Sequence, residues 1–317
     1  MKRKTLLFAV ILLVLSLKPA YSYWIWTPKT GKWINPKNAP KPTPKEQFEY
    51  ALTLFDAKDY EEARRQFIIL LRSYPKSLEA SEGQYYMGRI LEEEGNLYEA
   101  YLAYQKVIEK YPFSERIQEI IERECKVGEA FLAGEKRKVF GVPLPVDNPA
   151  IEIFTQVIEN STYGPEAPKA QYKLGLVLKG LMRYYEAEEA FNKVISNYPA
   201  SEWVEAAKYQ IAACRAAISR GPAYDQGAAK EAQEKFEEFV REHPDAVLSE
   251  KAEKNIEELK EKEAEGNFNI ARFYEKQKQY EAARVYYHEI LNKYPDSQWA
   301  KKARERLEVL KRMEKKR

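Results

Sequence analysis

Residues 83–112, GQYYMGRILEEEGNLYEAYLAYQKVIEKYP, decide the fold of this chain. The residues that matter in this stretch are Gly88, Leu97, Ala100, Tyr104 and Pro112. Ala100 and Tyr104 are just over one helical turn apart and share a helix face, where the small alanine lets a second helix approach and the ring fills the space beside it. Pro112 cannot continue the helix. The stretch therefore predicts a pair of packed helices.

The same register recurs along the chain. An alanine is followed four residues later by an aromatic six times, and in five cases a proline stands twelve residues after the alanine: Ala63/Phe67/Pro75, Ala100/Tyr104/Pro112, Ala187/Phe191/Pro199, Ala232/Phe236/Pro244 and Ala283/Tyr287/Pro295. The sixth pair, Ala150/Phe154, lacks the proline. Repeats of this length predict stacked helical hairpins. We expect an all-α fold, a right-handed α-solenoid of about six tetratricopeptide-like hairpins, which favours a binding scaffold over an enzyme.

The predicted domain boundaries follow from this register. We place the repeats at about residues 45–77, 79–114, 115–164, 166–200, 202–246 and 248–296, with a capping helix at 297–313. The third repeat is interrupted by a loop at 134–149, in which Pro143 and Pro145 follow Phe140. A solenoid grows by adding hairpins, so the length of 317 residues does not require separate cores.

The first 22 residues are predicted to be a secretory signal peptide. Lys2, Arg3 and Lys4 precede an apolar run from Thr5 to Leu17, and small residues follow it. This run is shorter than the roughly 20 residues that span a bilayer, although an uncleaved anchor is the alternative. The segment holds four basic and no acidic residues, so without it the net charge falls from +3 to −1. That charge gives no electrostatic support to a nucleic-acid partner.

The two cysteines, Cys125 and Cys214, are predicted to be buried thiols in first helices two repeats apart. Packed helices lie about 8–10 Å apart, which makes their separation roughly 20 Å, whereas a disulfide needs Cα atoms within about 7 Å. An intramolecular bridge is the alternative. Neither cysteine stands at the predicted cleavage site, so we expect no lipid-attachment cysteine.

Two segments outside the regular repeats are candidates for docking a partner. Residues 23–44 contain Trp24, Trp26 and Trp33, five prolines, four lysines and no acid, which predicts an extended arm. The arm either covers the apolar end of the first repeat or docks on a partner or the cell envelope. The loop at 134–149 carries the charged and aromatic residues Lys136, Arg137, Lys138 and Phe140. It is either a surface excursion or a partner-binding loop.

No pattern in the sequence points to catalysis. His243 replaces the tyrosine that precedes the repeat-ending proline elsewhere, and His288 has no second metal ligand one helical turn away. There is no phosphate-binding glycine loop, Cys/His cluster or serine elbow. The run Glu92–Glu94 points in three directions about 100° apart and is typical of a solvated face. We predict no enzyme activity, metal, cofactor or small-molecule substrate.

A peptide-binding groove is predicted on the first helices of repeats one and two. In stacked hairpins these helices line the inner face, and the positions that point into it are Phe48, Leu52, Phe55, Tyr85, Arg89 and Glu92. An apolar and aromatic surface beside an arginine suits an extended peptide, whose terminal carboxylate pairs with the arginine. The alternative is that a tryptophan of residues 23–44 fills the groove.

The chain resembles the BamD-like family of outer-membrane assembly lipoproteins. The resemblance is carried by the stretches at residues 43–67, 74–114 and 269–303, among them NIARFYEKQKQYEAARVYYHEILNKYPDSQWAKKA. It implies a protein at the periplasmic side of the outer membrane. Its amino-terminal repeats would receive the carboxy-terminal strand of unfolded β-barrel proteins, and its carboxy-terminal repeats would hold a BamA-like insertase.

The chain departs from that family in two ways. Ser22 and Tyr23 stand where family members carry a lipidated cysteine, and the loop at 134–149 enlarges the third repeat. We therefore expect either a membrane-peripheral protein that is held at the membrane only by its partners, or a soluble relative with a different client. A Tol-Pal-type division coordinator and a structural scaffold of the envelope or of a secretin are the alternative functions. The first alternative lacks support because no apolar heptads precede residue 45.

Overall fold

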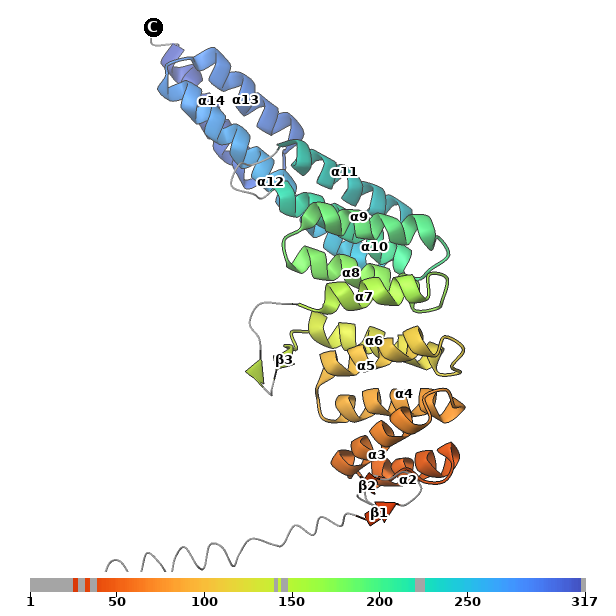
Figure 1. The fold of residues 1–317 in the computed structure, drawn as a ribbon. Helices are drawn as coiled ribbons and strands as arrows, with labels where there is room; N and C mark the ends of the chain where they lie inside the picture. The colour runs from red at the N-terminus through yellow and green to blue at the C-terminus, as the bar shows by residue number, and fades with distance from the viewer. Residues whose placement is uncertain are drawn as a thin grey trace, which may run out of the picture. The chain divides into compact units, whose positions relative to one another are not determined.

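The computed structural model describes residues 25–27, 32–34, 39–139, 142–143, 148–219 and 226–314. The predicted signal peptide, Trp24 and Phe140 lie outside these residues. The chain divides into two compact units, one up to Ile120 and one from Ile121 onwards. Each unit is built from antiparallel helical hairpins, so the all-α solenoid fold predicted from the repeats is confirmed (Figure 1).

The first unit contains a short β-hairpin and two helical hairpins. Strands β1 (Ile25–Thr27) and β2 (Lys32–Ile34) pair antiparallel. The helices are α2 (Pro44–Asp56), α3 (Tyr60–Ser73), α4 (Leu78–Glu93) and α5 (Leu97–Lys110). The sequence predicted only an extended arm before α2. Strands of three residues are too short for an alternating pattern to identify them.

The second unit continues the series of hairpins. Helix α6 (Ile117–Leu132) begins within the first unit and pairs with α7 (Ala150–Asn160). The loop between them contains the two-residue strands β3 (Lys138–Val139) and β4 (Val142–Pro143). The remaining helices are α8 (Ala167–Gly180), α9 (Tyr184–Asn197), α10 (Trp203–Ser219), α11 (Gln226–Glu242), α12 (Val247–Lys276), α13 (Tyr280–Lys293) and α14 (Gln298–Glu314).

The turn inside four of the hairpins has the same backbone geometry. One residue of each turn adopts the left-handed conformation, with φ of 61° at Lys58, 72° at Gly95, 60° at Met182 and 61° at Lys278. Glycine adopts this conformation without a Cβ clash, whereas other residues are strained by it. Among these four turns, only that of the second repeat therefore has a glycine, Gly95, at the left-handed position.

Three glycines of the first helices lie against the repeat aromatics. A Cβ on Gly88 would lie 2.6 and 2.9 Å from Cδ1 and Cζ of Tyr104, and one on Gly175 would lie 2.5 Å from Cε1 of Phe191. The third repeat has the same contact between Gly128 and Phe154. Gly88 and Gly175 each stand twelve residues before the alanine of their repeat, whereas the inserted loop separates Gly128 from Ala150 by a longer distance, so the sequence did not indicate Gly128.

Neighbouring hairpins are joined by the tyrosine that precedes the repeat-ending proline. The Tyr111 hydroxyl donates to the Pro75 carbonyl at 3.2 Å, and the Tyr198 hydroxyl donates to the Thr162 carbonyl at 3.0 Å. Each bond satisfies a carbonyl in the turn one repeat earlier. A hydroxyl at this position thus fixes the distance between successive turns.

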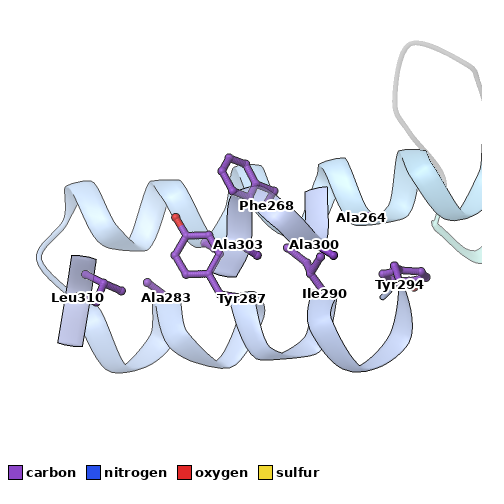
Figure 2. Packing of buried hydrophobic residues seen from close by; sticks show 10 residues of the cluster. Ala264, Phe268, Ala283, Tyr287, Ile290, Tyr294, Ala300, Ala303 and Leu310 are labelled. Carbon is purple, nitrogen blue, oxygen red and sulfur yellow. The ribbon is translucent and has the colours of Figure 1, made fainter. Parts of the chain in front are cut away.

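The last hairpin and the final helix share one core (Figure 2). Phe268 of α12 and Tyr287 of α13 lie beside Ala300 and Ala303 of α14, with ring centres 5.5 Å apart. The Tyr287 hydroxyl donates to Glu275 at 2.8 Å. Arg306 of α14 donates to the same carboxylate. Helix α14 therefore covers the end of the last hairpin through both apolar and ionic contacts.

Candidate functional site

Three half-buried aromatic rings meet on the first helices of the first unit. Thr43 caps α2 by accepting the Glu46 N–H at 3.2 Å, which fixes where that helix begins. Phe48 and Phe55 then lie two turns apart on one face of α2. Their ring centres are 5.8 and 5.0 Å from the ring centre of Tyr86 in α4. Phe48, Phe55 and Tyr86 form a partly exposed surface, here called the aromatic surface.

The other apolar residues predicted for the groove differ in exposure. Leu52 is half-buried on α2. Tyr85 is only 1% exposed, so its ring belongs to the core and does not line an open groove, contrary to the prediction. Its hydroxyl donates to Glu119 at 2.5 Å and accepts a hydrogen bond from Nη1 of Arg89 at 3.2 Å. Tyr85 thus positions the arginine.

Arg89 lies at the edge of the aromatic surface. Its guanidinium carbon is 5.8 Å from the ring centre of Phe55. Its Nε is 3.6 Å from Glu92, and its Nη2 is 3.7 Å from Glu93. Both distances exceed those of charge-assisted hydrogen bonds, which are about 2.7–2.9 Å. Arg89 is therefore held in an ionic cluster at the end of α4, beside the ring of Phe55.

Glu92 also forms a contact within its own hairpin. The Tyr104 hydroxyl donates to it at 2.5 Å, and Glu275 and Tyr287 repeat this contact in the last hairpin. In both hairpins the glutamate stands four residues after the small residue of the first helix, and the tyrosine is the repeat aromatic. The pair supports a structural role for Glu92, beside its predicted place in the groove.

Two residues of this region were not indicated by the sequence. The positions assigned to the inner face stand three residues before and one or four residues after the small residue. Tyr86 stands two residues before Gly88 and was therefore not included. Arg116 comes from the turn before α6, and its Nε donates to both carboxylate oxygens of Glu82 at 3.1 Å. The hydrogen bonds to Glu82 and Glu119 raise the pKa of Arg116. The ring of Tyr85 lies 5.0 Å below that guanidinium. The sequence signal that could have indicated Arg116 is Glu119, a possible ionic partner three residues later.

The first helices of three repeats also share a glutamine that the sequence reasoning missed. Nε2 of Gln47, Gln84 and Gln171 donates to the backbone carbonyl nineteen residues later, at 3.1, 3.0 and 3.1 Å. Each glutamine stands four residues before the small residue. Because a buried amide needs a partner, these bonds fix the register of the two helices in each hairpin.

The predicted docking segments are only partly described. Trp26 and Trp33 are cross-strand neighbours in β1 and β2, with ring centres 5.7 Å apart. Lys136 is exposed, Arg137 is half-buried, and Lys138 lies in β3. Trp24 and Phe140 are outside the described residues. The structure therefore brings two of the three tryptophans together.

Both cysteines are buried and form no disulfide, as predicted. Burial raises the pKa of Cys125 to about 12 and that of Cys214 to about 11. Among the helices of the described residues, none combines the length and the apolar character needed to cross a bilayer.

Two sequence families match the chain. The tetratricopeptide repeat family matches residues 49–115, which contain Phe55 and Tyr86 of the aromatic surface. The outer membrane lipoprotein family YfiO matches residues 148–316. Both are scaffold-type families. No curated protein sequence matches the chain.

The chain is also similar to solved structures of tetratricopeptide repeat proteins. The carboxy-terminal part of one from Cytophaga hutchinsonii is 20% identical, with 82% of this chain and 87% of that chain covered and a TM-score of 0.40. One from Parabacteroides merdae is 16% identical, with 82% and 96% covered and a TM-score of 0.36. Since the lipoprotein family match spans more than half of the chain, this protein belongs to the BamD-like outer membrane lipoprotein family and is built on tetratricopeptide repeats.

Proposed function

We propose that this protein is an exported scaffold at the periplasmic side of the outer membrane that receives unfolded β-barrel proteins. Membership of the outer membrane lipoprotein family supports the location, and the tetratricopeptide repeats support protein binding. The observation that carries the proposal is the aromatic surface of α2 and α4, which stands directly beside Arg89.

The first unit supplies the client site in this proposal. A β-barrel strand alternates apolar and polar residues, so its apolar side chains would pack on Phe48, Phe55 and Tyr86. Its terminal carboxylate would pair with Arg89, which lies beside the ring of Phe55. Leu52 would extend the apolar surface along α2.

The second unit supplies the site for a BamA-like insertase. The lipoprotein family match lies entirely within this unit, from residue 148 to residue 316. The Arg306–Glu275–Tyr287 contacts would keep α14 fixed to the last hairpin while a partner is bound. The loop at 134–149, with Lys136 exposed, is a second place where a partner could bind.

A peptide titration tests the client site. The probe is a peptide with the alternating pattern of a barrel strand that ends in an aromatic residue. The variant is Arg89→Glu, and the matched control is Arg72→Glu, an equal charge change at an exposed position of α3. We expect Arg89→Glu to weaken binding by about tenfold or more, because it places a carboxylate opposite the peptide terminus. Equal affinities of the two variants would exclude the site.

A further inference from the structure

Lys179 of α8 stands at a position that two other repeats fill with a glutamate. It follows Gly175 by four residues, and the equivalent residues are Glu92 in the second repeat and Glu275 in the last. Both glutamates accept a hydrogen bond from the tyrosine hydroxyl of their own hairpin. The aromatic residue of the fourth repeat is Phe191, which has no hydroxyl. Lys179 therefore lacks the contact within the hairpin that the two glutamates make.

Helix packing does not account for a lysine at this position. The first and third repeats also have a phenylalanine as the repeat aromatic, and they carry Phe55 and Leu132 where the fourth repeat carries Lys179. An apolar side chain therefore suffices for the hairpin. Lysine instead brings a charge into a half-buried position, which is costly unless the charge is paired. Burial lowers the pKa of Lys179, as is usual for an ammonium group that is withdrawn from water.

The ammonium group of Lys179 is bonded to a neutral partner. Its Nζ donates to Oε1 of Gln210 on α10 at 2.6 Å. None of the ion pairs between described residues includes Lys179. The residue lies in the last turn of α8, whose negative helix end offsets only part of a full charge. Because an ammonium has three N–H donors, the group can still bind an anion.

Gln210 and the packing of α8 on α10 hold Lys179 in place. Nε2 of Gln210 donates to the Tyr172 hydroxyl at 3.4 Å, so the amide bonds to two residues of α8. Tyr172 and Lys179 are almost two helical turns apart and share a face of that helix. The ring of Tyr172 packs on Trp203 of α10, with ring centres 5.0 Å apart. The position of the ammonium group is therefore set before a ligand arrives.

The charges along α8 favour an acidic ligand. The helix contains three lysines and no acidic residue. Glu129 lies 3.2 Å from Nζ of Lys169 and 3.3 Å from Nζ of Lys173, and Glu166 lies 3.8 Å from Nζ of Lys169. These two carboxylates balance the first two lysines. Among the described residues, no carboxylate is left to balance Lys179.

A carboxylate fits this position better than a phosphate does. A single ammonium beside a neutral amide balances one negative charge, whereas phosphate sites combine several N–H groups at the positive end of a helix. Lys179 is at the negative end of α8, where a doubly charged group is disfavoured. The tetratricopeptide repeats of the chain support protein binding, so we assign the carboxylate to a polypeptide.

We propose that α8 and α10 bind an acidic segment of a partner polypeptide, with an aspartate or glutamate side chain of that segment paired to Lys179. The inference goes beyond the proposed function, which assigns no ligand chemistry to these helices. The site belongs to the second unit and does not use the aromatic surface or Arg89.

Affinity selection from a peptide library tests this proposal. The probe is a synthetic library of short random peptides, acetylated and amidated so that they carry no terminal charge. The protein is the full chain without its predicted signal peptide. We expect the selected peptides to share an aspartate or glutamate, whose replacement by asparagine or glutamine weakens binding by about tenfold. Selected peptides without a shared acidic residue would overturn the proposal.

Variants of Lys179 locate the site. Lys179→Met keeps the aliphatic stem and is expected to weaken binding of a selected acidic peptide by about tenfold, whereas Lys179→Arg keeps most of the affinity. The matched control is Lys193→Met on α9 of the same repeat, whose Nζ is 2.8 Å from Glu189 at the surface. This control is expected to bind like the wild type. Unchanged binding by Lys179→Met, or an equal loss in the control, would overturn the assignment.

Thermal denaturation separates a ligand site from a structural role. Lys179→Met is expected to unfold at the same temperature as the wild type or higher, because it removes a half-buried charge that has no ionic partner. A clearly lower unfolding temperature would show that the fold needs the ammonium group, and the proposal would be wrong.

Two further comparisons identify the ligand and the unit that binds it. Glutarate at the concentration of the acidic peptide is expected not to displace it, and displacement would show a site for small carboxylates in place of a polypeptide. Arg89→Glu is expected to keep its affinity for the acidic peptide, and Lys179→Met its affinity for the barrel-strand peptide. If Arg89→Glu alone lost the acidic peptide, that peptide would bind the first unit, and this inference would fail while the client site stood.

Discussion

Replacing Gly88 by alanine probes the close contact between glycine and aromatic ring that the second, third and fourth repeats share. The new Cβ would stand 2.6 and 2.9 Å from two ring atoms of Tyr104, and nearer still to Cε1. Ring carbons normally approach a methyl group no closer than about 3.5 Å, so the ring must move by about 1 Å. Tyr104 is fully buried and its hydroxyl is bonded to Glu92, which leaves it little room.

The expected cost follows from two opposing effects. Forcing a methyl group into a packed core costs about 1–3 kcal/mol, and a ring held at both ends belongs near the upper limit. Alanine in place of glycine within a helix stabilises the helix by about 1 kcal/mol, because alanine has the higher helix propensity. We therefore expect Gly88→Ala to destabilise the second repeat by about 2 kcal/mol.

Repeat proteins can open locally and do not always unfold as one unit. The loss of stability in the second repeat is therefore measured by hydrogen exchange of α4 and α5 with mass spectrometry. Gly266→Ala in α12 is the matched control, since a Cβ there meets no atom within 4 Å. It is expected to stabilise its helix by up to about 1 kcal/mol. If the backbone amides of α4 and α5 exchanged as slowly in Gly88→Ala as in the wild type, the close-packing argument would be wrong.

Three further predictions concern the turns, the acid stability and the thiols. Lys58→Gly is expected to stabilise the first hairpin by about 0.5–1 kcal/mol in urea denaturation, because glycine removes the strain at φ 61°. Burial alone would raise the pKa of Glu275, but hydrogen bonds from Arg306 and Tyr287 outweigh it and lower the pKa below 4.5. Its contribution is therefore present above pH 4.5 and is lost as the pH falls further, so Glu275→Gln should be less stable than the wild type at neutral pH and approach it in acid, as measured by denaturation across pH. Cys125 and Cys214, with raised pKa values, should react with a thiol reagent at about pH 8 only after unfolding.

Much of the fold was predictable because its rules are local. The small residue, the aromatic four residues after the alanine and the repeat-ending proline each act within one hairpin, so their spacing appears directly in the sequence. Gly128 was missed because an inserted loop separates it from Phe154. The β1–β2 pairing was missed because three-residue strands carry too little pattern.

The candidate site was less predictable because it depends on side-chain packing between helices. Register placed Phe48, Phe55 and Arg89 in one region, and the structure brings them together with Tyr86. Register alone could not reveal that the ring of Tyr85 is buried. It also could not reveal the ion pairs that connect Arg89 with Glu92 and Glu93, since several rotamers of long side chains fit the same backbone.

Crosslink mapping tests the central claim that α2 and α4 hold an extended polypeptide. A barrel-strand peptide with a benzophenone beside its terminal aromatic residue would be photolysed with the protein, and the adducts would be located by mass spectrometry. We predict adducts on α2 and α4 around Phe55 and Tyr86, which an excess of unlabelled peptide abolishes. Adducts confined to α3, α5 or the second unit would contradict the claim.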